Sequence, residues 1–422
     1  MKKEFLVPSL GPCRFESPLD GAFFVDAHAG VLVDATARSC RTCKGGPDTL
    51  EQAGPRRKIF FDPRGTRAAV VTCGGLCPGL NDVIRALTMV IWYRYGVRDI
   101  LGLKYGYEGL VEAPGNRPVR LTPDIVEDIH KDGGSILHTS RGEQAVPVMV
   151  DFLVKNRIGI LFTIGGDGTH RGSLAIADEV RKRRLSIAIV GIPKTIDNDI
   201  AFTERTFGFE TAVAMSRTPI TCAHMEAKGV RNGVSIVRLM GRESGFVAAY
   251  ATLASSDVNL VLVPEVPFTM DKVCAFLKDR LRRKSHAVIV AAEGAGQELV
   301  PTEGTDASGN RKLGDIGAFL KTAITDYFKC APRPATVRYI DPSYTIRSAP
   351  AIADDSVFCF QLAENAVHAA MSGRTAMLVG LWNGFFVHIP MQKAVQTRKQ
   401  IDPTGLLWQS VLDNTGQPAV LA

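Results

Sequence analysis

Residues 158–169 read IGILFTIGGDGT, and this stretch decides how the surrounding chain is expected to fold. Its first seven letters are almost continuously apolar, which is typical of a strand buried on both faces of a parallel sheet. The glycines that follow let backbone N–H groups approach a ligand closely, and we expect a helix over 172–183 after them. The stretch predicts a strand–loop–helix unit whose loop lies where open parallel sheets bind ligands.

The same order of elements recurs outward in both directions along the chain. Near-continuous apolar strands that alternate with helices indicate parallel sheets covered on both faces, and they are too many for one sheet. The predicted fold class is therefore α/β, with two Rossmann-like three-layer domains, mostly parallel sheets and an N-terminal arm. The expected strands are 68–72, 158–164, 186–192, 234–239, 259–263, 287–292, 336–340 and 377–381, and the expected helices are 81–94, 172–183, 210–226, 243–254, 270–283, 315–328 and 356–371.

Composition narrows the function classes. The 422 residues include 50 Lys and Arg against 43 Asp and Glu, a net charge of +7, which is typical of a nucleic-acid surface or of a pocket for small anions. The denser basic runs lack interleaved aromatic residues, which disfavours nucleic acid, and no apolar stretch approaches the length of a membrane span. Nine cysteines, an odd count, suit a reducing, cytosol-like compartment. Cys40 and Cys43 form a C-x-x-C pair that is either a redox pair or spare loop cysteines.

The loop after the first expected strand reads TCGGLCPGLND over 72–82. Gly74 and Gly75 would let backbone N–H groups approach a phosphate, and Asn81 is expected to cap the helix that follows. A tight turn that needs a positive φ would give the same letters, so this loop alone leaves both interpretations open.

Asp167 stands inside the glycines of IGGDGTHRG over 164–172. A carboxylate among phosphate-binding amides is electrostatically unfavourable unless a cation lies between it and the phosphates. Because Mg²⁺ prefers one or two carboxylates together with phosphate oxygens, the loop predicts a magnesium–nucleotide site.

The next strand leads into GIPKTIDND over 191–199. Phosphoryl transfer to an alcohol needs a positioned carboxylate to accept the hydroxyl proton, and Asp197 fits that role. Asp199 would be a second carboxylate, which either faces the cation or orients the reacting groups. Lys194 would add a positive charge near the phosphates. A helix cap with a solvated neighbour is the alternative for an isolated D-N-D motif, but three such loops on one sheet favour catalysis.

Further residues suit a sugar phosphate. Arginine binds phosphate bidentately, and a carboxylate binds sugar hydroxyls. Arg141, Arg242, Glu293 and Arg347 supply these groups, although each one taken singly would fit a surface salt bridge.

Together these motifs resemble those of the 6-phosphofructokinases. The segments GGLCPGLND, SRG, GGDGT, PKTIDND, TFGF, LMGRESGF, VPEVPF, AEGAGQ and YIDPSYTIR occur in the order of that family, and the resemblance runs from about residue 58 to the end. The amino-acid sequences of these motifs are similar to those of the plant and algal ATP-dependent branch, which is related to the pyrophosphate-dependent enzymes.

The resemblance implies the fold, the reaction and the site residues. It implies transfer of the γ-phosphoryl group of ATP to fructose 6-phosphate with Mg²⁺, a role in glycolysis, allosteric regulation and a homo-oligomer. It implies a 1–57 extension, an ATP-binding domain over 58–192, a fructose-6-phosphate-binding domain over 193–345, and a segment over 346–422 that packs back on both. ATP would be held by Gly74, Arg141, Gly142, Gly166, Gly168 and Thr169, with Asp167 on Mg²⁺. Asp197 would be the base, and the sugar-phosphate site would hold Thr195, Ile196, Asp197, Met240, Gly241, Arg242, Glu293, Tyr344 and Arg347.

Two positions depart from the family patterns. Gly168 leaves room for a nucleoside where pyrophosphate-dependent members resemble GGDD, whereas Lys194 resembles the pyrophosphate type. The glycine is given more weight, because ATP physically requires a small residue there. The arginine that bacterial members send from a neighbouring subunit aligns with Gly233, with Arg231 close by.

The sequence thus predicts a cytoplasmic ATP-dependent 6-phosphofructokinase, or a plastid one if the N-terminus is trimmed. A pyrophosphate-dependent enzyme and a non-catalytic sugar-phosphate-binding regulatory subunit are the alternatives. No nucleic-acid or membrane partner is expected.

Overall fold

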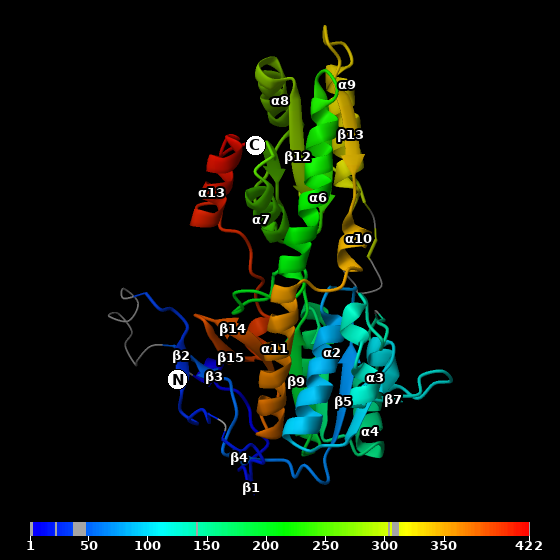
Figure 1. Cartoon of the computed structure of the whole chain (residues 1–422), viewed down its shortest axis with the longest axis vertical. Helices are drawn as coiled ribbons and strands as arrows, with labels where there is room; N and C mark the ends of the chain where they lie inside the picture. The colour runs from blue at the N-terminus through cyan, green and yellow to red at the C-terminus, as the bar shows by residue number, and fades with distance from the viewer. Residues whose placement is uncertain are drawn as a thin grey trace. The chain divides into compact units, whose positions relative to one another are not determined.

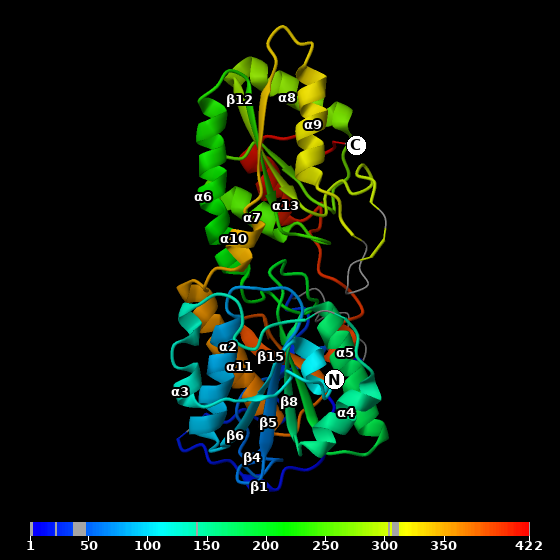
Figure 2. The ribbon, with the colours of Figure 1, turned by 90° about the vertical axis from the view of Figure 1, so that its right-hand side faces the viewer.

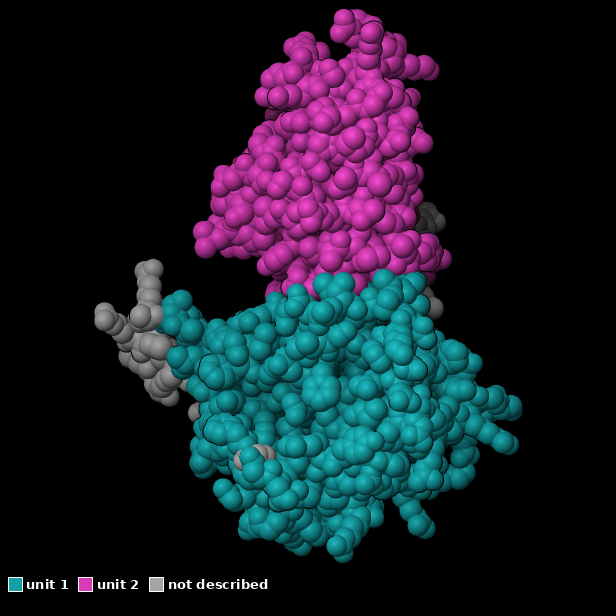
Figure 3. All heavy atoms as spheres, viewed as in Figure 1, with its two compact units in different colours: residues 1–195, 200–208, 348–398 teal, residues 196–199, 209–347, 399–422 magenta. Residues whose placement is uncertain are grey.

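The computed structural model describes residues 3–21, 23–36, 48–140, 142–302, 304–305 and 312–421. The chain forms two compact units, which Figure 3 shows in different colours. Unit 1 comprises Met1–Thr195, Ile200–Gly208 and Ser348–Arg398, and unit 2 comprises Ile196–Asp199, Phe209–Arg347 and Lys399–Ala422. The chain therefore passes between the units several times.

Unit 1 is built on a nine-stranded sheet in the order β2-β3-β15-β14-β9-β8-β5-β6-β7. Its five middle strands, β14, β9, β8, β5 and β6, are parallel, and the strands at both edges are antiparallel. The strands are β2 (Gly30–Leu32), β3 (Thr49–Gln52), β5 (Arg67–Thr72), β6 (Asp99–Leu103), β7 (Val119–Arg120), β8 (Ile160–Gly165), β9 (Ala188–Pro193), β14 (Met377–Trp382) and β15 (Phe385–Pro390), and β1 (Phe15–Glu16) pairs with β4 (Lys58–Ile59) in a separate ribbon.

Helices cover both faces of this sheet. Figure 2 shows α2 and α11 on one side of β5 and β8, and α4 and α5 on the other. Residues of β5 and β8 that point toward α4 and α5, such as Val71 and Leu161, share a buried core with Leu153 and Ile176. The helical segments are η1 (Lys3–Phe5), α2 (Leu80–Met89), η2 (Val90–Arg94), η3 (Gly106–Leu110), α3 (Pro123–Val126), η4 (Ile129–Lys131), α4 (Val146–Lys155), α5 (Asp167–Lys182), α11 (Ala353–Met371) and α12 (Met391–Ala394).

Unit 2 has a four-stranded, fully parallel sheet in the order β11-β12-β10-β13. Successive side chains of a strand point to opposite faces, so Val237 and Leu239 join a core with α6, α7 and α13, while Val234 and Ile236 join one with α8 and α9. The elements are α6 (Phe209–Lys228), β10 (Gly233–Leu239), α7 (Phe246–Ser255), β11 (Leu260–Leu262), α8 (Met270–Lys284), β12 (His286–Ala292), α9 (Ile316–Phe328), β13 (Thr336–Ile340), α10 (Ser343–Arg347) and α13 (Leu406–Thr415).

The predicted fold class is confirmed, since each unit is a three-layer α/β structure, with a fully parallel sheet in unit 2 and five parallel strands at the centre of the sheet in unit 1. Among the described residues, no helix combines the length and the apolar character needed to cross a membrane. Strands β2 and β3 belong to the segment that the sequence presented as an arm, and they extend the sheet of unit 1.

Two helix starts were predicted wrongly. Helix α5 begins at Asp167 and not at residue 172, because a first turn tolerates glycines that would weaken a helix interior. Asn81 does not cap α2, which begins at Leu80 after Gly79 in a left-handed conformation. The Asn81 amide instead donates to the carbonyl oxygen of Asp132 and accepts from the N–H of Ile136, so it fixes the loop beside the helix.

Candidate active site

The glycine loops gather at one edge of the sheet in unit 1. Strands β5, β8 and β9 are parallel neighbours, so their carboxyl ends lie side by side. Backbone hydrogen bonds continue past the strand ends, from the N–H of Cys73 to Ile164 at 2.9 Å and from the N–H of Lys194 to Gly165 at 2.8 Å. The tertiary structure therefore brings together three loops that are far apart in sequence.

Gly74 shows why the first loop requires a glycine. Its φ of 84° lies in the left-handed region, and a Cβ atom there would lie 3.2 Å from Nζ of Lys194. The N–H of Gly74 donates to the carbonyl oxygen of Ser140 at 3.1 Å, which brings Ser140 to the same edge. Gly142 lies two residues further along the chain, whereas Arg141 lies outside the described residues.

Asp167 is the first residue of α5, where the helix dipole favours negative charge. Its Oδ2 atom lies 2.7 Å from a guanidinium nitrogen of Arg171 and 3.3 Å from one of Arg398. The Asp167 side chain is 17% exposed. Two arginine partners therefore hold the Asp167 side chain at the loop.

The remaining glycines of this loop have different surroundings. A Cβ atom at Gly165 would lie 2.2 Å from Oγ1 of Thr169, so a side chain there would displace Thr169. A Cβ atom at Gly166 would contact the carbonyl oxygen of Lys194 at 3.4 Å. A Cβ atom at Gly168 would meet no atom within 4 Å. The structure thus leaves free space beside Gly168.

Lys194 lies at the junction of two loops. Its side chain is buried, and Nζ donates to the carbonyl oxygen of Gly75 at 2.7 Å. The next residue, Thr195, has its carbonyl oxygen bound by the hydroxyl of Thr206 at 2.6 Å. A buried positive charge beside Gly74 would attract the phosphate groups of a ligand.

Several residues predicted to bind the sugar phosphate lie around Asp197 in unit 2. Its Oδ2 atom accepts a hydrogen bond from the backbone N–H of Arg242 at 3.3 Å, and its carbonyl oxygen accepts one from the Ser244 hydroxyl at 3.2 Å. Gly241 precedes Arg242 with a φ of 128°, and a Cβ atom there would lie 2.5 Å from the carbonyl oxygen of Ser244. The M-G-R motif therefore needs its glycine to present the Arg242 N–H to Asp197.

Glu293 follows β12 and joins the same cluster. Its N–H donates to the carbonyl oxygen of Leu239, and the N–H of Gly294 donates to that of Gly241, both at 2.9 Å. Burial raises the pKa of Glu293, while the positive charges of Arg238, Arg347 and Arg242 act against that rise. The carboxyl group thus lies among three guanidinium groups, an arrangement suited to a phosphorylated polyol.

Arg347 and Tyr344 lie together on α10. The Arg347 guanidinium stacks over the Tyr344 ring at 4.6 Å, and Arg347 Nε donates to the Ser343 carbonyl oxygen at 3.2 Å. Tyr344 is 75% exposed, and Met240, the residue that follows β10, is buried. Ile196 packs against the core of unit 2, and the carbonyl oxygen of Asp199 accepts the N–H of Lys399.

The residues predicted to bind the two substrates belong largely to different units. Every described residue predicted to bind ATP, together with Lys194 and Thr195, belongs to unit 1. Every other residue predicted to bind the sugar phosphate belongs to unit 2.

Gly233 is buried at the start of β10, where a Cβ atom would lie 2.1 Å from the Ala227 carbonyl oxygen, so that position accepts no arginine. Arg231 is exposed.

Asp167 fits the chemistry of a Mg²⁺ ligand that works together with substrate phosphates. Within the described ranges, no three His, Cys, Asp or Glu side chains form a cluster that would hold a metal by themselves. Mg²⁺ is usually held by one or two carboxylates plus phosphate oxygens, so a single positioned carboxylate suits it. Gly168, which has open space beside it, directly follows Asp167 in the sequence.

Sequence reasoning missed Arg171, Arg398, Arg238 and Lys399. Arg171 was detectable in principle, because residues four apart on a helix are neighbours, but the predicted helix began too late to include Asp167. Arg398 lies 231 residues from Asp167 in the chain, and no local pattern links them.

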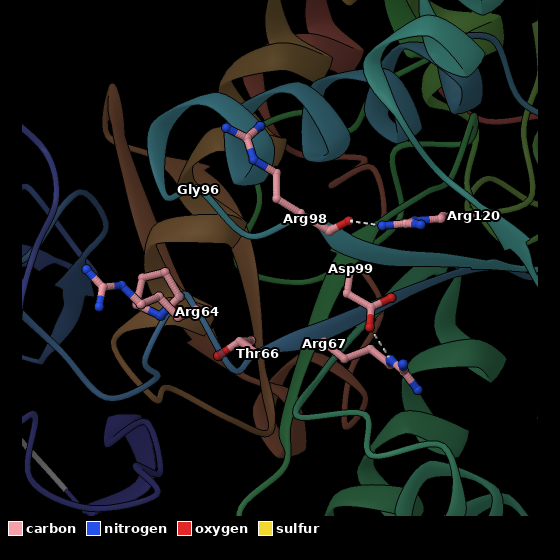
Figure 4. Close-up of a pocket in the computed structure, with 8 residues that line it drawn as sticks. Arg64, Thr66, Arg67, Gly96, Arg98, Asp99 and Arg120 are labelled. Atoms are coloured by element: carbon pink, nitrogen blue, oxygen red, sulfur yellow. Dashed lines mark hydrogen bonds and ion pairs between the residues drawn. The ribbon is translucent and has the colours of Figure 1, made fainter.

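A separate hollow of about 460 Å³ lies in unit 1 at the amino ends of β5 and β6, away from the glycine loops (Figure 4). Four arginines line it, and three of them interact with other groups of the protein. Arg67 pairs with Asp99 at 2.6 Å, Arg98 stacks over Trp92, and Arg120 donates to the Arg98 carbonyl oxygen. Figure 4 shows the labelled arginine side chains pointing in different directions, so we assign no ligand to this hollow.

Comparisons with known proteins identify relatives of this chain. The family model described as Phosphofructokinase matches residues 67–370. The chain is 46% identical over 433 residues to a Borreliella burgdorferi protein named ATP-dependent 6-phosphofructokinase, covering 98% of this chain and 97% of that protein. It is 45% identical over 387 residues to ATP-dependent 6-phosphofructokinase 7 of Arabidopsis thaliana, covering 90% of this chain and 79% of that protein. The crystal structure of a pyrophosphate-dependent phosphofructokinase from Marinobacter aquaeolei matches with a TM-score of 0.69 at 18% identity, over 85% of this chain and 92% of that chain, which concerns the fold alone.

Proposed function

Because this chain belongs to the phosphofructokinase family, we propose that it transfers the γ-phosphoryl group of ATP to the 1-hydroxyl of fructose 6-phosphate and yields fructose 1,6-bisphosphate. The observation that carries the proposal is the position of Asp197. Its carboxylate accepts the backbone N–H of Arg242, so one hydrogen bond fixes the proposed base next to a proposed phosphate-binding arginine.

The nucleotide half of the reaction would belong to unit 1. The amides of the first turn of α5 and of the Gly74 turn would bind phosphate oxygens, and Lys194 would add a positive charge beside them. Asp167 would hold Mg²⁺, which neutralises charge on the transferred group when it is bound. The proposed ATP residues are Gly74, Arg141, Gly142, Gly166, Asp167, Gly168 and Thr169.

The acceptor half would belong to unit 2. Asp197 would take the proton of the 1-hydroxyl as its oxygen bonds to the γ-phosphorus and the bond from that phosphorus to the leaving ADP oxygen breaks. Arginines would bind the 6-phosphate, and Glu293 would accept sugar hydroxyls. The proposed sugar-phosphate residues are Thr195, Ile196, Asp197, Met240, Gly241, Arg242, Glu293, Tyr344 and Arg347, with Asp199 as an orienting carboxylate.

The free space at Gly168 supports ATP as the phosphoryl donor. The α-phosphate and nucleoside need volume next to the loop, and a Cβ atom at Gly168 meets nothing within 4 Å. Lys194 is the feature shared with the pyrophosphate type, and a buried lysine is compatible with either donor because both carry phosphate groups.

A coupled assay that compares ATP with pyrophosphate, in reduced and oxidised samples, tests the proposal. We expect turnover of fructose 6-phosphate with ATP and Mg²⁺. Turnover with pyrophosphate alone would overturn the donor assignment, and binding of fructose 6-phosphate without turnover would indicate a regulatory subunit. A dependence on oxidation would indicate a redox-active cysteine, and Cys40 and Cys43, which lie outside the described residues, are the candidates that the C-x-x-C spacing offers.

We further propose a cytoplasmic homo-oligomer that acts in glycolysis. Seven cysteines in the described part of the chain are free thiols, which supports a reducing compartment. Light scattering during size-exclusion chromatography would measure the oligomer size.

A further inference from the structure

Two consecutive basic residues, Arg398 and Lys399, each contact a different catalytic loop. The Arg398 guanidinium lies 3.3 Å from Oδ2 of Asp167. Lys399 donates its backbone N–H to the carbonyl oxygen of Asp199 and its Nζ to Oδ1 of Asn198, both at 2.9 Å. Arg398, which pairs with the proposed Mg²⁺ ligand Asp167, is therefore the chain neighbour of Lys399. Lys399 in turn holds the loop that contains the proposed base.

Backbone pairing strengthens this connection. Arg398 forms an antiparallel bridge with Ile200, immediately after the D-N-D loop. The bridge and the bond from Lys399 to Asp199 make 398–399 a short strand-like segment alongside 199–200. A displacement of Arg398 would consequently shift the backbone that carries Lys399.

The conformation of the D-N-D loop gives Lys399 a defined role. Asn198 has a φ of 55°, in the left-handed region that non-glycine residues adopt only at a cost in free energy, and it is 4% exposed. The hydrogen bond from Lys399 to the Asn198 side chain helps to hold that conformation. Because Asp197 is the neighbouring residue, its carboxylate direction depends on the same backbone.

The ion pairs of Asp167 connect Arg398 to nucleotide binding. Arg171 and Arg398 both neutralise Asp167, and a divalent cation brought by the nucleotide would need the same carboxylate oxygens. Loading of the cation therefore competes with the Arg398 ion pair. Arg171 differs, because it pairs with Asp167 from one turn further along α5, whereas Arg398 is followed directly by the residue that bonds to Asn198 and Asp199.

We propose that Arg398 and Lys399 are positioning residues that couple occupation of Asp167 by the metal–nucleotide complex to the conformation of the Asp197 loop. This inference rests on the proposed function, because it takes Asp167 as the cation ligand and Asp197 as the base. It adds that the two substrates bind with energetic coupling and that this coupling passes through 398–399.

The first experiment measures Mn²⁺ affinity in the presence of ADP by the electron paramagnetic resonance signal of free Mn²⁺. In the full-length Arg398→Gln and Arg171→Gln variants, we expect affinity to rise about two- to fivefold, the range expected for the loss of one exposed ion-pair partner. Weaker Mn²⁺ binding in Arg398→Gln would show that Arg398 holds the nucleotide instead, which would overturn the competition.

The second experiment measures the Kd of fructose 6-phosphate by calorimetry, with and without the unreactive analogue AMP-PCP and Mg²⁺. We expect the analogue to change the wild-type Kd at least fivefold. Arg398→Gln and Lys399→Met should reduce that effect below twofold, whereas Arg171→Gln, the matched control, should retain it. Absence of coupling in the wild type, or equal coupling in all variants, would disprove the inference. Failure of the proposed function would appear separately, as wild-type protein without ATP-dependent turnover.

Discussion

The ammonium group of Lys194 donates a hydrogen bond to the carbonyl oxygen of Gly75 at 2.7 Å, although 119 residues separate them in the chain. The bond ties the loop after β9 to the loop after β5. It also places Nζ of Lys194 3.2 Å from the position that a Cβ atom at Gly74 would occupy, so the two proposed phosphate-binding loops depend on one another.

Replacing Lys194 by methionine should keep most of the side-chain volume and remove the charge. Because a hydrogen bond to a charged group contributes about 1.5–3 kcal/mol, we expect kcat/KM for ATP to fall about tenfold to a hundredfold. Steady-state kinetics would measure the loss, with the exposed Lys182→Met on α5 as the control. Equal kinetics in both variants would contradict a phosphate-binding role for Lys194.

Asp197→Ser should lower kcat by about 10²- to 10⁴-fold, the usual contribution of a general base. The fold should survive, since the serine is smaller and unit 2 retains its core. The exposed Asp178→Ser is the matched control, and circular dichroism would report the fold of both variants. Near-normal turnover in Asp197→Ser would mean that another group takes the proton.

Gly168→Asp should change donor use without unfolding the protein. The new side chain enters open space, but its charge would repel the α-phosphate, so kcat/KM for ATP should fall at least about a hundredfold. Use of pyrophosphate relative to ATP should rise in the same coupled assay. Gly65→Asp makes the same change at another open glycine and should have no effect on either donor.

Glu51→Gln should alter the pH dependence of stability. Glu51 is buried, which by itself would raise its pKa, but the hydrogen bond from His388 and the charge of Arg374 lower it to about 2. A lowered pKa in the folded state means that the stabilisation is present above the unfolded value of 4.5 and is lost as pH falls toward about 2. The shift corresponds to about 3 kcal/mol at neutral pH.

Thermal unfolding between pH 3 and pH 7 would measure this effect. The variant should have a lower Tm than the wild type at pH 7, because the guanidinium groups of Arg56 and Arg374 lose their carboxylate partner. The difference between the two curves should narrow as the pH falls from about 4.5 toward about 2. The exposed Glu16→Gln should follow the wild type, and parallel curves for Glu51→Gln and wild type would contradict the assignment.

Much of the fold could be predicted from local patterns. The strands β5, β8, β9 and β10 appeared as buried apolar runs, and their positions in the structure agree within two residues at each end. Strand β15 was missed, although Asn383 and Gly384 form a two-residue turn with positive φ, which is a known hairpin signal. Strands β2 and β3 are short and gain their stability from pairing with a distant strand, which no local pattern reveals.

In the candidate site, too, the sequence predicted some residues and missed others. Asp167, Asp197 and the glycines were recognisable because each motif is contiguous and follows a strand. Arg398 and Lys399 were not, because their partners lie about two hundred residues away and an arginine or lysine in a loop looks the same whether it is solvated or paired.

The sequence by itself determined the family, the α/β architecture and the types of chemical group in each loop, because backbone sterics and hydrophobic periodicity act over a few residues. Only the tertiary structure decided which groups meet: Lys194 with Gly75, Arg398 with Asp167, and Lys399 with Asn198. Such pairs depend on the order of strands in the sheets and on where the chain returns, and these follow from the packing of the whole chain.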